Sequence, residues 1–129
     1  MQIHQSAEDY LETILMLTQR MGKVRSIDVV NELGFTKASV SIAMKKLREN
    51  GYIAVDGEGN LTLLEPGREI AERIYSRHRL LTHFFVQLGV DEKTAAEDAC
   101  KAEHILSEQT LEKIREKALQ ADAEQNDPQ

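Results

Sequence analysis

Three short segments of helical periodicity, each followed by a glycine, open the chain and constrain its fold more than any other feature. Apolar residues recur in these segments at every third or fourth position, which is the spacing of amphipathic helices. The segments are residues 7–20, 27–33 and 37–50. Gly22, Gly34 and Gly51 follow them and predict their ends, because glycine readily adopts the left-handed conformation that terminates helices. The residues expected to cap their N-termini are Ser6, Ser26 and Thr36.

The periodicity changes beyond the third predicted helix. Residues 52–55 and 61–64 are β-prone, and the turn-forming stretch 56–60 between them predicts a hairpin. Helical periodicity then returns over residues 66–88, 91–106 and 107–121. The order predicts a mainly α fold, with a winged helix-turn-helix domain over residues 1–65 and an all-helical domain over residues 66–129.

The distribution of charge separates two parts of this chain. Its net charge is −6, yet residues 20–50 hold seven basic residues against three acidic ones, a net +4. Residues 91–129 hold eleven acidic residues against five basic ones, a net −6. This asymmetry favours a DNA-contacting part and a separate sensing or assembly part. The alternatives are two ordinary solvated faces, or a helix-turn-helix that does not bind DNA.

The third predicted helix has the position of a recognition helix. A tight turn at Gly34-Phe35 would set the helix angle that lets it enter a major groove. The residues expected to contact double-stranded DNA are Lys23, Arg25, Thr36, Lys37, Ala38, Ser39, Ser41, Lys45 and Lys46. The basic side chains suit phosphates, and Ala38 suits a thymine methyl group. The hairpin tip is acidic, so we expect it to contact DNA weakly. A homodimer on a palindromic operator is expected, because one module covers only part of a site.

Three types of metal-ligating side chain lie within five residues near the C-terminus. Cys100, Glu103 and His104 stand at i, i+3 and i+4, so we expect them on one face of a helix. The alternative is a buried cysteine beside a surface Glu-His pair. The single cysteine forms no internal disulfide, and we find no signal-peptide pattern and no apolar run of membrane-spanning length. We therefore expect a cytoplasmic protein with no membrane partner.

Several short motifs occur in a specific order and spacing. They are Glu8-Asp9-Tyr10-Leu11-Glu12, Thr36-Lys37-Ala38-Ser39-Val40-Ser41, Leu61-Thr62-Leu63 followed by Gly67, Arg77-His78-Arg79-Leu80-Leu81, and residues 98–107 around Cys100. In these motifs the chain resembles the diphtheria toxin repressor family, which includes the manganese transport regulators. The resemblance implies a metal-dependent transcriptional repressor of metal-uptake genes and not an enzyme. It is to the short members, without the C-terminal SH3-like domain of the larger iron-responsive ones.

The resemblance also implies that residues 66–129 are a metal-binding and dimerisation domain, with a metal ion that bridges the first helix and the dimerisation helices. The matching positions are Asp9, Glu12, His78, Cys100, Glu103 and His104. Glu12 and His78 match positions that hold a second ion in manganese-type members. The alternatives are that Asp9 serves a capping box with Ser6, that Glu12 is solvated and that His78 is a surface histidine. His4 and His83 match no family role and are interpreted as incidental.

The implied site is a hybrid of two family types. Manganese-type members have glutamate in place of Cys100, and iron-type members have methionine in place of Asp9. Thr82 and Ala96 stand where iron-type members have ancillary ligands. Because a thiolate is a soft ligand, we expect Fe2+ as the physiological metal and Mn2+ next, with Zn2+, Co2+ or Ni2+ able to bind in vitro. The alternative function is a winged-helix regulator that senses a small organic ligand or thiol oxidation through Cys100.

Overall fold

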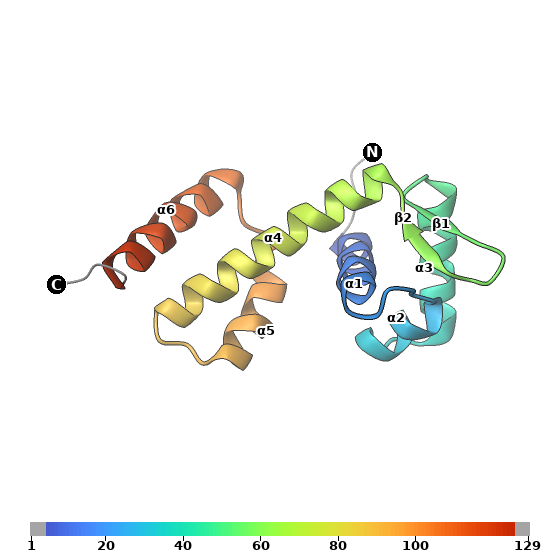
Figure 1. The fold of residues 1–129 in the computed structure, drawn as a ribbon, viewed down its shortest axis with the longest axis horizontal. Coiled ribbons are helices and arrows are strands. Elements are labelled where there is room, and N and C mark those ends of the chain that lie inside the picture. The colour runs from blue at the N-terminus through green and yellow to red at the C-terminus, as the bar shows by residue number, and fades with distance from the viewer. Residues whose placement is uncertain (1–4, 126–129) are drawn as a thin grey trace. The chain divides into compact units, whose positions relative to one another are not determined.

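The computed structural model describes residues 5–125 and is mostly helical, with one small hairpin (Figure 1). Its elements are α1 (Gln5–Met21), α2 (Ser26–Leu33), α3 (Lys37–Glu49), β1 (Ile53–Val55), β2 (Leu61–Leu63), α4 (Glu65–Gln87), α5 (Glu92–Ala102) and α6 (Glu108–Gln125). The predicted mainly α fold with a winged helix-turn-helix is confirmed. Among the described residues, no helix has both the length and the apolar character that a membrane span requires.

The chain divides into two compact units, Met1–Arg73 and Ile74–Gln129. The division falls inside α4, whereas the sequence predicts a boundary between residues 65 and 66, at the start of that helix. The two units are described separately here as the N-terminal unit and the C-terminal unit.

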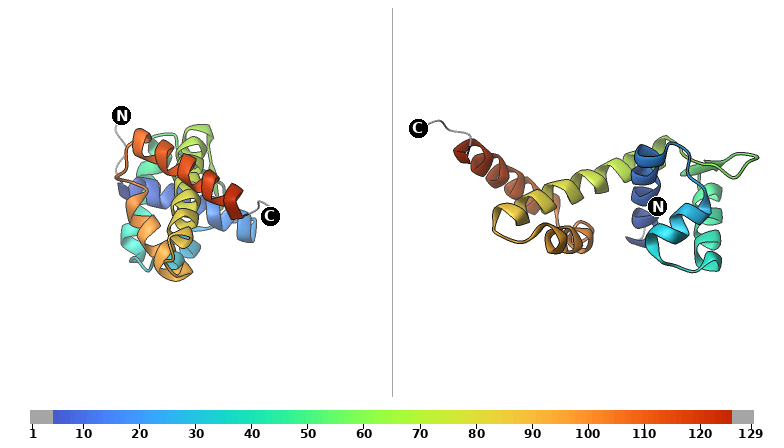
Figure 2. Two further views of the ribbon diagram at one scale, coloured as in Figure 1. Left: turned by 90° about the vertical axis from the view of Figure 1, so that its left-hand side faces the viewer. Right: turned by 60° about the horizontal axis from the view of Figure 1, so that its bottom comes forward.

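In the N-terminal unit, α1, α2 and α3 pack together beside the hairpin (Figure 2). Its core is formed by apolar side chains that are at most 1% exposed. They include Leu11, Ile14, Val24, Val29, Val40 and Ile53. All but Val24, which lies between α1 and α2, occupy apolar positions of the predicted helices and strands, so burial of the periodic face is what assembles the unit.

The predicted helix ends are largely confirmed in this unit. Gly22 and Gly34 follow α1 and α2 with φ of 87° and 72°, the left-handed conformation that glycine adopts without steric cost. Thr36 caps α3, and its hydroxyl oxygen accepts the N–H of Ser39 at 3.1 Å. Two predicted caps are wrong. Ser6 lies within α1, and Ser26 is the first residue of α2, which is preceded by Arg25 as its N-cap.

The hairpin is antiparallel, with Ile53 opposite Leu63. Its tip is organised by the carboxylate of Asp56, which accepts the N–H groups of Glu58 and Asn60, each at 2.9 Å. These hydrogen bonds, chiefly those from Asn60, lower the pKa of Asp56. The carboxylate of Asp56 therefore organises the backbone of the hairpin tip.

Gly67, at the start of α4, lies where no side chain fits. A Cβ atom there would lie 2.2 Å from the carbonyl oxygen of Tyr52 and 3.3 Å from a methyl carbon of Leu11. Glycine is therefore required for the close approach of α4 to the hairpin backbone.

In the C-terminal unit, the second part of α4 packs with α5 and α6 around Leu81, Ala99 and Leu111. The carboxylate of Asp91 accepts the N–H of Thr94, and the hydroxyl of Ser107 accepts the N–H of Thr110, each at 3.1 Å, so these helix starts are as predicted. Two helix ends differ. α5 ends at Ala102 instead of about residue 106, and α6 continues to Gln125 instead of about residue 121.

Candidate metal centre and DNA interface

A buried cluster of one carboxylate and two imidazoles lies in the C-terminal unit. Glu103 is fully buried, and its Oε2 lies 3.0 Å from Nδ1 of His78 on α4. Its other oxygen, Oε1, lies 3.4 Å from Nε2 of His104, whose side chain is 1% exposed. The Glu103 carboxylate therefore stands between two imidazoles that come from different parts of the unit.

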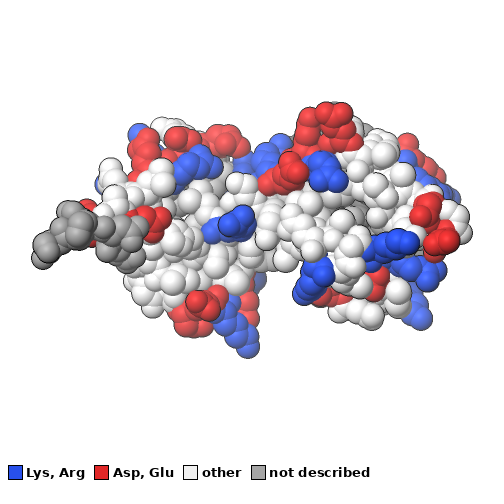
Figure 3. Space-filling model, viewed as in Figure 1, with Lys and Arg blue, Asp and Glu red and all other residues white. Residues whose placement is uncertain are grey.

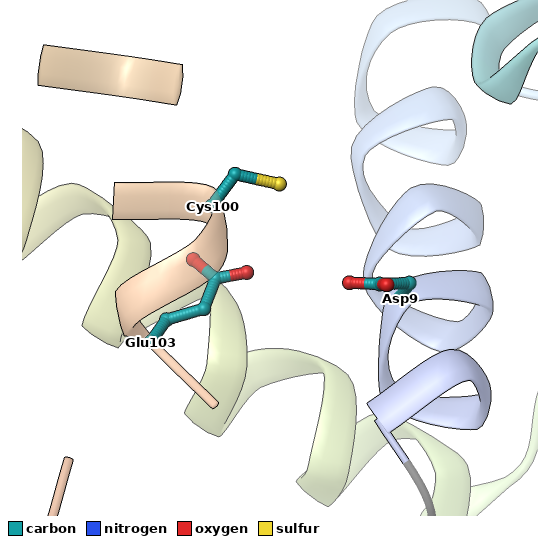
Figure 4. Close-up of side chains that lie close together, drawn as sticks. All are labelled: Asp9, Cys100 and Glu103. Carbon is teal, nitrogen blue, oxygen red and sulfur yellow. The ribbon is translucent and has the colours of Figure 1, made fainter. Parts of the chain in front are cut away.

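Cys100 adds a thiol to this cluster. It lies in the last turn of α5, is exposed, and its Sγ lies within 4.8 Å of a carboxylate oxygen of Glu103. Figure 4 shows both side chains projecting from the C-terminal end of α5. The exposed position rules out the alternative of a buried structural cysteine.

The backbone that carries Glu103 and His104 is not the predicted helical face. Because α5 ends at Ala102, Glu103 is its C-cap residue, and His104 lies in the turn that follows. The N–H of Ile105 bonds the carbonyl of Ala102 at 3.1 Å, which tightens this turn and closes the helix. The prediction that one helix carries all three residues is therefore wrong, although Glu103 keeps helical dihedral angles and its carboxylate lies near both Cys100 and His104.

The donor types in this cluster fit a divalent transition metal. Glu103 Oε1 is buried and accepts no hydrogen bond within residues 5–125. A buried carboxylate is costly unless it is hydrogen-bonded, paired or bound to a metal. Oxygen, imidazole nitrogen and thiolate sulfur are together the ligands of iron, cobalt, nickel and zinc sites.

Asp9 and Glu12 lie in the N-terminal unit, one turn apart on α1. Glu12 is only 5% exposed, so the interpretation of this residue as solvated is wrong. Asp9 is half-buried, and its charge, together with burial, raises the pKa of Tyr10, with burial the larger cause. Ser6 lies inside α1, so it does not form the N-terminal capping box considered for Asp9. Figure 4 labels Asp9 on this helix.

The other two histidines, His4 and His83, are not part of this cluster as the structure describes it. His83 bonds the carboxylate of Asp122 on α6 at 2.9 Å and contacts the Gln87 amide at 3.1 Å. It therefore links α4 to α6 and lies outside the carboxylate cluster. His4 lies outside the described residues.

The exposed face of α3 carries most of the residues predicted to contact DNA. Val40, Met44 and Leu47 are buried, which leaves the opposite face in solvent. The exposed predicted residues on or next to this helix are Thr36, Lys37, Ala38, Ser39, Ser41, Lys45 and Lys46. Ile42 is also 58% exposed on this helix, and the sequence analysis did not include it in the exposed face. Its position between the inward residues 40 and 44 is the signal that could have found it.

Lys23 and Arg25 lie in the segment between α1 and α2, and both are exposed. Arg25 forms a β-bridge with Asn60 of the hairpin, so this segment is fixed to the wing. The Arg25 guanidinium lies along Gly59, where an added Cβ would be 3.3 Å from Nη2. A basic side chain therefore accompanies the acidic hairpin tip. On the face drawn in Figure 3, basic and acidic side chains are interspersed.

The sequence matches two family descriptions that together cover most of the chain. Residues 2–61 match the iron dependent repressor N-terminal DNA binding domain, and residues 64–122 match the iron dependent repressor metal binding and dimerisation domain. An uncharacterized HTH-type transcriptional regulator of Methanocaldococcus jannaschii is 38% identical over 113 residues, which are 86% of this chain and 90% of that protein. The HTH-type transcriptional regulator MntR of Bacillus subtilis is 34% identical over 109 residues, 84% of this chain and 77% of that protein.

Solved structures are similar over most of this chain. A manganese-dependent transcriptional repressor in complex with manganese matches with a TM-score of 0.79 and 30% identity, over 87% of this chain and 52% of that one. The manganese regulator SloR matches with a TM-score of 0.75 and 26% identity, over 90% of this chain and 54% of that one. The chain thus spans about half the length of these two solved proteins. With both family domains matched in order along its length, this chain belongs to the iron dependent repressor family.

Proposed function

We propose that this chain is a metal-dependent repressor of transcription that acts in the cytoplasm and binds palindromic operators in double-stranded DNA as a homodimer. Membership of the iron dependent repressor family supports metal-dependent repression and dimerisation. We assign DNA binding to residues 1–65 and metal binding with dimerisation to residues 66–129. The role is regulatory and not catalytic, as the names of the related transcriptional regulators suggest.

The observation that carries this proposal is the buried Glu103 carboxylate between two imidazoles, with an exposed thiol beside it. His78, His104 and Cys100 would supply nitrogen and sulfur ligands around the oxygens of Glu103. A divalent cation bound there supplies the positive charge that offsets the carboxylates and thiolate. The alternative function, a winged-helix regulator that senses a small organic ligand or thiol oxidation through Cys100, assigns no role to the buried carboxylate and the two imidazoles.

We further propose that Asp9 and Glu12 of α1 complete the ligand set. Both are carboxylates on a helix whose buried residues are mainly apolar, and Glu12 is 5% exposed. Without a cation, carboxylates gathered at one site repel each other, and α1 is free to shift. When a bound cation offsets the charge of these carboxylates, it would hold α1 and the C-terminal end of α5 together. The equilibrium then favours the arrangement in which the recognition helices of a dimer fit successive major grooves.

The ligand set can be tested by metal affinity. Asp9→Ala and Glu12→Ala are expected to weaken metal binding, whereas Glu32→Ala, at an exposed position on α2, is the matched control. The measurement is a competition titration against a chelator of known affinity. Unchanged affinity in both α1 variants would place the whole metal site within the C-terminal unit and overturn the proposed bridge.

For the metal itself, we propose Fe2+ as the physiological ion and Mn2+ as the next candidate. Cys100 supports iron because manganese prefers oxygen ligands. The similarity to a manganese-dependent repressor supports manganese. An operator-binding titration under anaerobic conditions, with the free concentration of each metal buffered, distinguishes them. Activation at cellular levels of manganese but not of iron would overturn the iron assignment.

A further inference from the structure

Two consecutive residues of α4 contact Glu103, one at its side chain and the other at its backbone. His78 contacts its carboxylate at 3.0 Å, and Arg77 Nη1 donates a hydrogen bond to its backbone carbonyl oxygen at 3.2 Å. Neighbouring positions on a helix point about 100° apart, so the two side chains approach Glu103 from different directions. α4 thus fixes both the backbone and the side chain of this residue.

The carbonyl bound by Arg77 is one that α5 leaves without a helical partner. Glu103 is the C-cap residue of α5, and carbonyl groups in the last turn of a helix lack intrahelical donors. A cation at this end also complements the negative end of the helix dipole. Arg77 therefore holds the helix end from which the Glu103 and His104 side chains depart.

The second arm of the Arg77 guanidinium reaches across the turn to α6. Its Nη2 forms an ion pair with Glu108, in the first turn of α6, while the Arg77 side chain is itself only 15% exposed. The guanidinium thus spans the turn between α5 and α6, which carries His104. The planar fork of arginine suits such a double contact, and the single ammonium group of lysine does not reproduce it.

We infer that Arg77 is a positioning residue of the metal centre, which sets the orientation of the Glu103 carboxylate toward the ion. This inference rests on the proposed metal-binding function. Arg77 does not itself ligate, because a guanidinium has no free electron pair to offer. Groups that orient metal ligands typically change metal affinity about 10- to 100-fold when they are removed.

The test is an anaerobic cobalt(II) titration of the full chain, followed by visible absorption. Arg77→Gln and Arg77→Lys are both expected to weaken cobalt affinity about 10- to 100-fold. Both should also shift the cobalt bands at saturation, because the geometry around the ion relaxes. The matched control is Arg79→Lys on the same helix, where the guanidinium lies over the Tyr75 ring, and wild-type affinity and spectrum are expected.

Two further measurements separate positioning from a purely structural role. Glu108→Gln removes the exposed ion-pair partner but leaves the carbonyl hydrogen bond, so it should retain nearly the wild-type spectrum. Circular dichroism establishes that each metal-free variant is folded at the titration temperature. Unfolding of both Arg77 variants, or a wild-type spectrum and affinity in a folded one, overturns the inference. Failure of the wild-type chain to bind cobalt would instead overturn the proposed function.

Discussion

The two units of this chain hold their key residues in different ways. The exposed face of α3 is set by one helix and its own cap, since Thr36 bonds Ser39 within the same turn. The candidate metal centre instead takes His78 from α4 and Glu103 from the end of α5, and Glu103 is fully buried. The candidate DNA interface is therefore local in sequence and solvated, whereas the candidate metal centre depends on helix packing. Substitutions in the first should leave metal affinity unchanged, and substitutions in the second should alter the metal response.

Glu103→Gln is expected to have the largest effect. The amide keeps the shape of the side chain but removes the negative charge and its ligand strength. We expect metal affinity to fall more than about 100-fold, beyond the loss typical of residues that only orient ligands. Metal-stimulated operator binding should disappear, while weak binding without metal remains. Metal titration and fluorescence anisotropy with operator DNA measure the two effects.

The control for this variant is Glu97→Gln, at an exposed position on α5, the helix that ends just before Glu103, and it should bind metal as the wild type does. A full metal response in Glu103→Gln would show that the Glu103 cluster is not needed for metal-dependent operator binding, and would contradict the proposed difference between the two units.

Cys100→Ser should change the metal preference. Loss of the thiolate removes the soft ligand, so affinity for iron, cobalt and zinc should fall by on the order of tenfold or more, and affinity for manganese should fall less. Competition titrations with each ion measure the order. An equal loss for every ion would show that sulfur does not determine the preference.

Lys37→Ala should leave metal affinity unchanged and weaken operator binding. Lys37 is exposed at the N-terminus of α3 and is proposed to contact a phosphate. Removing one such contact should lower the slope of log affinity against log salt by about 1 and weaken binding to all sequences alike. The control is Lys93→Ala, an exposed position in the first turn of α5. An unchanged salt slope in Lys37→Ala would place this residue away from the DNA.

Thr36→Ala should have the smallest effect. It removes the cap of α3, which is expected to cost about 1 kcal/mol in the free energy of unfolding. Urea unfolding of the metal-free chain measures the loss, with Ser41→Ala as the control at an exposed position of the same helix. Equal stability in the two variants would mean that the hydrogen bond from the Ser39 N–H to the Thr36 hydroxyl contributes nothing to stability.

The local part of the fold could be predicted from the sequence, because caps, glycines and apolar periodicity act within a few residues. The cap at Thr36 and the left-handed glycines after α1 and α2 are examples. The end of α5 could not be predicted in this way. It is held by Arg77, which is 26 residues away in sequence, and no local pattern around Glu103 indicates that contact.

The candidate site shows the same limit. The sequence shows three possible ligand types at Cys100, Glu103 and His104, and their spacing predicts one helical face. In the structure the helix ends before Glu103, so Glu103 and His104 lie beyond it. The burial of Glu12 also depends on packing. From the sequence alone, a buried ligand and a solvated helix residue are equally consistent with its position. The exposure of Ile42 could not be inferred from residue type, because an apolar side chain on an amphipathic helix is expected to be buried.

The most direct test of the account is the operator affinity of one preparation before and after metal is removed. The chain is stripped by chelation, its metal content is measured, and anisotropy is recorded with labelled operator DNA at fixed salt. We expect weak, sequence-insensitive binding by the stripped protein and tight, sequence-specific binding once iron or manganese is restored. Equally tight and specific binding by the stripped protein would contradict it.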